Sequence, residues 1–426
     1  MRSLFDMLYR FPSLIRRIFL GEASQVFIAQ SATKAVSFLV FVIMSKSLAR
    51  EQYSQFVLLF AFLGMATEIG SVAFLQSMAR FAAEHRNERS RHGSIILTAF
   101  VGGTFAGAFL AMITLILLKI DFVPSAIRYS IHAVLIYIVA MVSTSSINAV
   151  FNGLGLHRTY LISLLTNSFA LLAFTILAEN QYGLSLHNVP YVYAFSAILQ
   201  VLFQLIFLVR KKPRAIEFKS YKYIITYGTW YLLWSVFSII ESKVDVFIID
   251  ASGFRNDVAA YDVSLRFLQI IQVVATTIST VALPQLLAAG KDPSDLEKAR
   301  GSIRRNVRYA ALLNFLLIPV VICFVYVYYG GRYNEIFYLY PLHAVAMFFF
   351  LANLPLTAEI YRLGAVRYFF FASIIVAAAK LPLSYLLTGQ LGIMGTALSF
   401  IASQIVAFAF FFIAVRQFRH RQEVIT

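Results

Sequence analysis

Cysteine and charged residues are both scarce in this sequence. The single cysteine, Cys323, lies in an apolar run, which excludes a disulfide framework and a metal cluster held by thiolates. No GxxxxGK[ST] motif occurs, so the phosphate-binding loop of ATP-hydrolysing proteins is absent. Only 13% of the 426 residues are charged, whereas 60% are hydrophobic. A soluble domain does not need that much apolar surface, and the composition therefore indicates a polytopic membrane protein.

Long apolar segments recur along the chain. A helix needs about 20 apolar residues to cross the hydrocarbon core of a bilayer. Residues 1–23, which come before the first of these segments, lack an uninterrupted apolar core. We expect an interfacial segment there rather than a signal peptide. An even number of spans would place both termini on one side. The sequence predicts twelve spans, over residues 24–48, 53–79, 94–118, 129–151, 159–178, 190–209, 223–250, 259–286, 307–329, 337–356, 368–388 and 391–415.

The basic residues predict the orientation of these spans. Of the 36 Lys and Arg residues, 26 lie in the terminal segments and in the loops on their side, 5 in the opposite loops and 5 within spans. Because cytoplasmic loops carry an excess of Lys and Arg, both termini are expected in the cytoplasm and the membrane is expected to be the cell (inner) membrane. The same distribution explains the net charge of +16 by topology and contact with anionic lipid, without nucleic acid.

The two halves of the chain carry similar features. In SKSLAREQYSQFVLLF (45–60) and DASGFRNDVAAYDVSLRF (250–267), a helix end and a short polar turn precede a tyrosine that opens the next helix. Parallel repeats of this kind are related by a pseudo-two-fold axis along the membrane normal, and the substrate binds between them. The predicted organisation is an N-terminal segment 1–23, a six-helix bundle 24–209, a basic cytoplasmic linker 210–222, a second six-helix bundle 223–415 and a cytoplasmic tail 416–426.

The predicted span 223–250 contains charged residues and forms the first part of the candidate site. At helical spacing, Trp230, Trp234, Glu241 and Asp245 fall on one stripe. Ionisable residues inside a span are costly and usually face a bundle interior or a water-filled cavity. The stripe therefore predicts sugar stacking by the tryptophans and ion coupling by the carboxylates. The alternative for the aromatic residues is an ordinary place at the membrane interface.

Two cations lie at a similar depth in later spans. Arg266 shares a helical face with Asp262 and Gln269, and Lys380 lies in the eleventh span. We expect these cations to gather with the two carboxylates around a cavity in the outer half of the second bundle, where they bind phosphate oxygens. Asp262 and Arg266 are four residues apart, and mutual neutralisation is the structural alternative.

A further pair of charges is predicted in the first two spans. Lys34 and Glu68 lie at similar distances from the cytoplasmic ends of their helices. They form either a structural ion pair or a gate and cation site. No group of His, Cys or carboxylate residues has metal-ligand spacing, so no metal and no cofactor is expected, apart from coupling to H⁺ or Na⁺.

Three stretches of the sequence carry a resemblance to a known family: FIAQSATKAVSFLVFVIMSKSLAREQYSQFVLL, VDVFIIDASGFRNDVAAYDVSLRFLQ with VALPQLL, and YRLGAVRYFFFASIIVAAAKLPLSYLLTGQLGIMGTALSFIASQ. They resemble the polysaccharide-repeat-unit flippases of the O-antigen type, whose superfamily also contains multidrug/toxin extruders and lipid II flippases. The resemblance covers nearly the whole chain from about residue 24 and rests on helix ends and small residues. It implies a V-shaped pair of six-helix bundles, a cationic central cavity and alternating access with a lipid-linked oligosaccharide as cargo.

The predicted function is therefore that of a flippase for a polyprenyl-pyrophosphate-linked repeat unit in surface polysaccharide biosynthesis, not that of an enzyme. The expected partners are this cargo, the bilayer, and a polysaccharide polymerase with its chain-length machinery. Two alternatives remain. A cation-coupled multidrug extruder on the same fold should favour an acidic cavity, and a membrane glycan polymerase or ligase usually needs a large external loop. The predicted substrate-binding residues are Arg266, Lys380, Lys34, Trp230, Trp234 and Gln269; the predicted ion-coupling residues are Glu241, Asp245 and Glu68.

Overall fold

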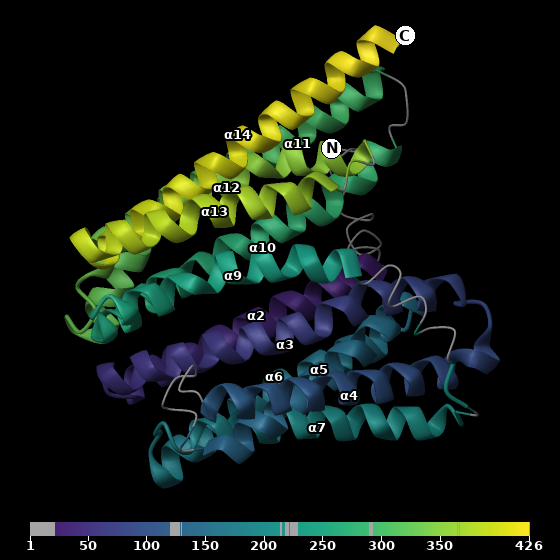
Figure 1. The fold of residues 1–426 in the computed structure, drawn as a ribbon, viewed down its shortest axis with the longest axis horizontal. Coiled ribbons are helices and arrows are strands. Elements are labelled where there is room, and N and C mark those ends of the chain that lie inside the picture. Colours follow the sequence, from purple (N-terminus) through teal and green to yellow (C-terminus); the bar gives the residue numbers. More distant parts are fainter. Residues whose placement is uncertain are drawn as a thin grey trace, which may run out of the picture. The chain divides into compact units, whose positions relative to one another are not determined.

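The computed structural model describes residues 22–119, 128, 130–213, 215–217, 221, 229–288, 293–363, 365 and 367–425. Twelve α-helices and no strand occupy this part of the chain (Figure 1). The helices are α2 (Glu22–Ser47), α3 (Arg50–Glu84), α4 (His92–Lys119), α5 (Ile131–Gly153), α6 (His157–Tyr182), α7 (Val189–Arg210), α9 (Thr229–Ala251), α10 (Val258–Ala288), α11 (Pro293–Tyr329), α12 (Ile336–Arg362), α13 (Arg367–Leu391) and α14 (Ile393–Ile425).

Each predicted span overlaps one of these helices, which confirms the all-α membrane fold. Residues 129 and 223–228 of the predicted spans lie outside the described residues. Ten of the described helices are long and apolar enough to cross a membrane, judged by length and composition alone. Helix α9 is not among them, and it carries Glu241, Lys243 and Asp245 within its length. A helix with three such residues needs polar partners if it is to lie inside a membrane.

Helix α11 differs from its predicted span, 307–329. It begins at Pro293, about four turns earlier, so much of the basic stretch that was expected to be a loop is helical. Proline suits the first helical position, and Asp295 in the first turn interacts favourably with the helix dipole. Ile303 in this extension is buried, which anchors the helix to its neighbours. The extension places a series of arginines on a defined helical surface.

The chain divides into two compact units, each described here by itself. Unit 1 comprises Met1–Ile43 and Ala66–Tyr231. Within it, α4 packs on α5, and α7 packs on both α5 and α6 (Figure 1). Gly103 and Gly107 allow the close approach of α4, since a Cβ on Gly107 would lie 2.8 Å from the Cα of Val139 on α5. This is the close helix packing that a GxxxG pattern favours.

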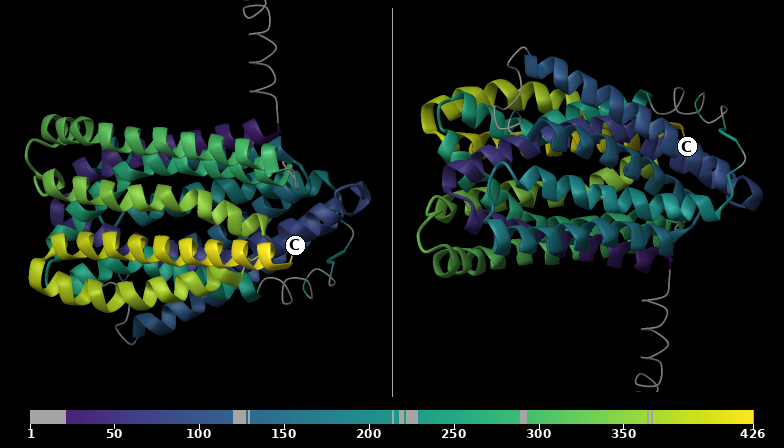
Figure 2. Two further views of the ribbon diagram at one scale, coloured as in Figure 1. Left: turned by 90° about the horizontal axis from the view of Figure 1, so that it is seen from above. Right: turned by 90° about the horizontal axis from the view of Figure 1, so that it is seen from below.

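Unit 2 comprises Met44–Met65 and Leu232–Thr426. Helix α12 packs on α10, α11 and α14, and α14 also packs on α13 (Figures 1 and 2). The segment Met44–Met65 contains the end of α2 and the start of α3, and hydrogen bonds attach it to α10 within unit 2. The hydroxyl of Ser54, for example, accepts a hydrogen bond from the backbone N–H of Ala259 at 3.1 Å. The bundle boundaries and the symmetry expected from the sequence stay a prediction.

Candidate functional site in unit 2

A buried ion pair lies at the centre of unit 2. The side chain of Lys380 on α13 is 1% exposed, and its Nζ lies 2.9 Å from Oδ2 of Asp245 on α9. The same ammonium donates a hydrogen bond to the backbone carbonyl of Glu241 at 2.6 Å and lies 5.1 Å from the ring centroid of Phe400. Two charges removed from water in this way are tolerated only when further hydrogen bonds satisfy them. The carbonyl of Glu241 and the aromatic ring supply part of that compensation.

Other polar groups complete the environment of Asp245. The Tyr261 hydroxyl donates to Oδ2 at 2.8 Å, and Ser384 approaches Oδ1 at 3.5 Å. The Tyr261 ring packs edge-on against His343, whose Nδ1 lies 2.7 Å from the Ser264 hydroxyl. Helices α9, α10, α12 and α13 therefore converge on one polar cluster, which we call the charged centre: Asp245, Lys380, Tyr261, Ser384, His343 and Ser264.

A second ion pair lies one residue farther along α10 from Tyr261. Nε of Arg266 lies 3.3 Å from Oδ2 of Asp262, one helical turn earlier. Oδ2 also accepts a hydrogen bond at 2.8 Å from the fully buried Tyr53 on α3. The side chain of Arg266 is 31% exposed, in contrast to that of Lys380. The structure thus places Arg266 and Asp262 together, and part of the arginine remains accessible to solvent or to a ligand.

A network at the loop end of unit 2 holds the segment Met44–Met65. Arg50 forms ion pairs of 2.8 Å with both Asp257 and Glu335. Arg332 donates to the backbone carbonyls of Lys46 and Leu48. The sequence marks Arg50 and Arg332 only as basic residues of predicted external loops, because their partners are distant in the chain.

The tyrosine next to Arg332 joins this network. Tyr333 is buried, and its hydroxyl donates to the carbonyl of Ser45 at 3.0 Å. Burial raises the pKa of Tyr333 to about 12. The phenol therefore stays neutral, and able to donate, throughout the physiological pH range.

Apart from Arg266, which pairs with Asp262, the predicted site residues fall into three groups. Asp245, Lys380 and the backbone of Glu241 meet in the charged centre. Trp234 on α9 and Gln269 on α10 are half-buried on the helices that supply it, whereas the side chain of Trp230 lies outside the described residues. Lys34 and Glu68 belong to unit 1, and both are exposed. The roles assigned to all of these residues stay a prediction.

Residues 20–288, more than half of the chain, match the family described as "Polysaccharide biosynthesis protein". This chain belongs to the polysaccharide biosynthesis protein family. A comparison with curated proteins found no significant match.

Solved structures of the MOP superfamily share the fold of this family member. A multidrug resistance MATE transporter in an inward-facing conformation matches with a TM-score of 0.69 and 14% identity, over 90% of this chain and 94% of the transporter. The lipid II flippase MurJ, in an inward closed conformation, matches with a TM-score of 0.69 and 14% identity, over 92% and 87% of the two chains. A MOP superfamily transporter from Pyrococcus furiosus matches with a TM-score of 0.60 and 15% identity, over 92% and 93%. At these identities the likeness concerns the fold.

Proposed function

We propose that this protein is an alternating-access flippase that moves a polyprenyl-pyrophosphate-linked oligosaccharide across the cell membrane, with both termini in the cytoplasm. Membership of the polysaccharide biosynthesis family is the observation that carries the proposal. The fold, shared with a lipid II flippase and with multidrug transporters, supports transport of a cargo rather than catalysis.

The charges inside unit 2 suit this cargo. A pyrophosphate cannot cross a hydrocarbon core about 30 Å thick without cations, because burying an unpaired ion is prohibitive. Arg266 is the cation best placed to bind it, since its side chain is partly exposed and a guanidinium binds phosphate oxygens bidentately. Trp234 on α9 and Gln269 on α10, together with Trp230, would contact the sugars.

Lys380 would bind the cargo phosphate only after its ion pair with Asp245 breaks. A proton on Asp245 would remove the negative charge and leave the ammonium available to the cargo phosphate. This is the role we propose for Asp245 in coupling to H⁺, with Glu241 and Glu68 as further candidate carboxylates. The charged centre contains one carboxylate, Asp245, and one ammonium, Lys380, so their charges cancel. A carrier of cationic drugs should instead favour an acidic site.

Deletion of the gene in its host, followed by complementation, tests the proposal. The deletion should abolish surface polysaccharide and accumulate the lipid-linked oligosaccharide in the cytoplasmic leaflet. Arg266→Gln should restore less than about a tenth of the glycan, since a hydrogen bond to a charged group contributes about 1.5–3 kcal/mol. Arg266→Lys should restore part of it, because the charge survives without the bidentate geometry.

Arg255→Gln is the matched control, because Arg255 lies just before α10, is 52% exposed and pairs with Asp250. All variants are compared at equal amounts of protein in the membrane. Unchanged surface polysaccharide in the deletion strain would contradict the proposal. Lost resistance to cationic drugs in that strain would favour the multidrug extruder instead.

A further inference from the structure

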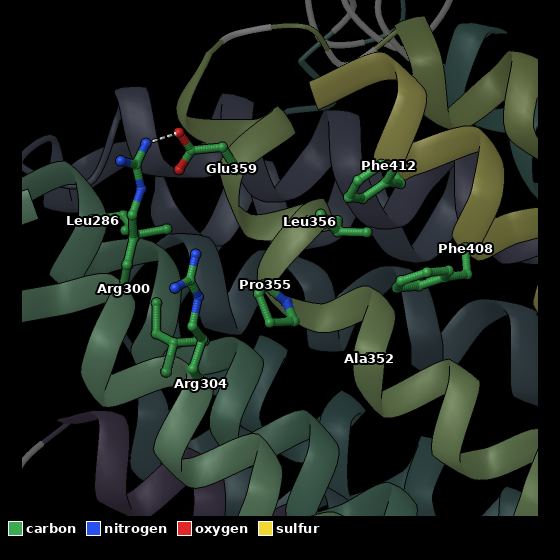
Figure 3. Close-up of a pocket in the computed structure, with 10 residues that line it drawn as sticks. Leu286, Arg300, Arg304, Ala352, Pro355, Leu356, Glu359, Phe408 and Phe412 are labelled. Atoms are coloured by element: carbon green, nitrogen blue, oxygen red, sulfur yellow. Dashed lines mark hydrogen bonds and ion pairs between the residues drawn. The ribbon is translucent and has the colours of Figure 1, made fainter. Parts of the chain in front are cut away.

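A pocket of about 240 Å³ lies in unit 2 between α10, α11, α12 and α14, and none of its lining residues belongs to the charged centre. We call it the arginine pocket. Figure 3 shows Arg300 and Arg304, from the early turns of α11, on one side and Phe408 and Phe412 on the other, with Pro355 and Leu356 between them. The distribution of basic residues predicts that this end of α11 lies at the cytoplasmic surface of the membrane.

The basic side of the arginine pocket carries more positive than negative charge. Glu359 is 2% exposed and pairs with Arg300 and with Arg362, the latter at 2.7 Å. Arg304 has no hydrogen-bond or ion-pair partner among the residues that the structure describes, and its side chain is exposed. One carboxylate and two guanidinium groups, those of Arg300 and Arg304, thus line the pocket, which leaves one positive charge for an anion to neutralise.

Two buried donors at the same place also lack acceptors. Nε of Arg300 and Nε of Arg362 are buried, and neither has a hydrogen-bond partner in the part of the chain that is described. Buried N–H groups are almost always satisfied, and an unsatisfied one points to a missing acceptor. Arg300 lines the pocket, so an oxygen-rich anion bound there could accept from both Arg300 and Arg304.

The opposite side of the arginine pocket is apolar. Phe408 and Phe412 stack with their ring centroids 6.2 Å apart, and Phe412 is 49% exposed. Pro355 and Leu356 connect this aromatic surface to the arginines. A pocket that is cationic at one side and apolar at the other suits an amphiphile with a phosphate and a hydrocarbon chain. Its volume is below the range of about 300–1,000 Å³ typical of ligand sites, so it would hold only the phosphate and the first part of one chain of such an amphiphile.

We propose that the arginine pocket binds an anionic phospholipid of the cytoplasmic leaflet. The phosphate oxygens accept hydrogen bonds from Arg304 and Arg300, and the first part of an acyl chain lies against Phe408 and Phe412. The surface potential of an anionic leaflet favours such a site at a basic helix end. The lipid would join α11 to α12 and α14 within unit 2. This site is independent of the proposed cargo and of its binding residues.

Native mass spectrometry of the full-length protein in detergent tests the site. The protein is titrated with phosphatidylglycerol or with phosphatidylcholine of the same chain length. Both headgroups carry the phosphate, but phosphatidylcholine also carries a cation. The wild type should therefore bind phosphatidylglycerol about tenfold more tightly, because the uncompensated guanidinium charge of the pocket repels choline. Arg304→Gln should lose most of this preference without loss of fold, because the structure gives Arg304 no partner. Arg305→Gln is the matched control, since Arg305 is the next residue, is exposed and does not line the pocket.

A second variant tests the apolar side. Ala352 lines the pocket and is half-buried, so Ala352→Phe should fill the space for the chain and weaken phosphatidylglycerol binding while every charge remains.

Equal binding of the two lipids by the wild type, or an unchanged preference in Arg304→Gln, would overturn the proposal. Inorganic phosphate that competes as well as the lipid would overturn the role of the chain. Tighter binding of polyprenyl phosphate than of phosphatidylglycerol would overturn the choice of ligand.

Discussion

The two units bury polar side chains in different ways. In unit 1, Gln204 on α7 donates to Asn148 at 3.0 Å and to Ser163 at 2.9 Å, which links α7 to α5 and α6 through neutral groups. Among the residues of unit 1 whose burial the structure describes, no buried side chain belongs to Asp, Glu, Lys or Arg. In unit 2, by contrast, Asp245, Asp262, Glu359 and Lys380 are all buried.

The two kinds of buried polar group differ in what their desolvation costs. A buried amide network needs only hydrogen bonds, and its desolvation is modest. A buried ion pair must offset the desolvation of two charges, and apolar residues of similar volume are often as stable or more so. Stability alone therefore gives no reason to retain Lys380 and Asp245, whereas the exchange of ion-pair partners that we propose for transport does. The comparison leads to three predictions on the free energy of unfolding, measured in mixed micelles.

The largest effect is expected at the charged centre. Lys380→Met leaves the carboxylate of Asp245 buried without its ion-pair partner and should lower the free energy of unfolding by about 3–5 kcal/mol. The double variant Lys380→Met with Asp245→Asn should recover most of this loss, because no uncompensated charge remains. Strictly additive losses in the two single variants and the double variant would show that the pair does not act as a unit.

A smaller effect is expected in unit 1. Gln204→Met keeps the volume and removes the donor to Asn148 and Ser163, which should lower the free energy of unfolding by about 1–3 kcal/mol. Surface glycan should remain near normal at equal protein level, since no charge is involved. A loss in stability as large as that of Lys380→Met would remove the distinction between the two interiors.

The smallest effect is expected for an ion pair at the surface of unit 2. Arg255 lies 2.5 Å from Asp250, but the arginine side chain is 52% exposed. Arg255→Gln should change the free energy of unfolding by at most about 1 kcal/mol, because water screens the pair and ordering the side chains opposes it. Raising the salt concentration should reduce even this difference, whereas the loss in Lys380→Met should be insensitive to salt. A large, salt-insensitive loss at Arg255 would mean that burial does not control the strength of these pairs.

The helices and the site were predictable to different degrees. The spans follow from the length of apolar segments, and each predicted span corresponds to a helix. The extension of α11 to Pro293 was missed because its arginines suggested a solvated loop, although a helix can keep them on one face and bury Ile303. The arginine pocket was missed because its two sides come from α11 and α14, which are distant in the chain.

The sequence by itself determined the membrane class, the order of the helices and the presence of charges within them, since a helix must shield its backbone from lipid over a known length. It also placed Glu241 next to Asp245 and Asp262 next to Arg266, because residues four apart share a helical face. Only the tertiary structure decided that Lys380 pairs with Asp245 and that Tyr53 binds Asp262. Those contacts depend on the rotation and depth at which distant helices pack, and these are set by the shapes of many side chains together rather than by any local pattern.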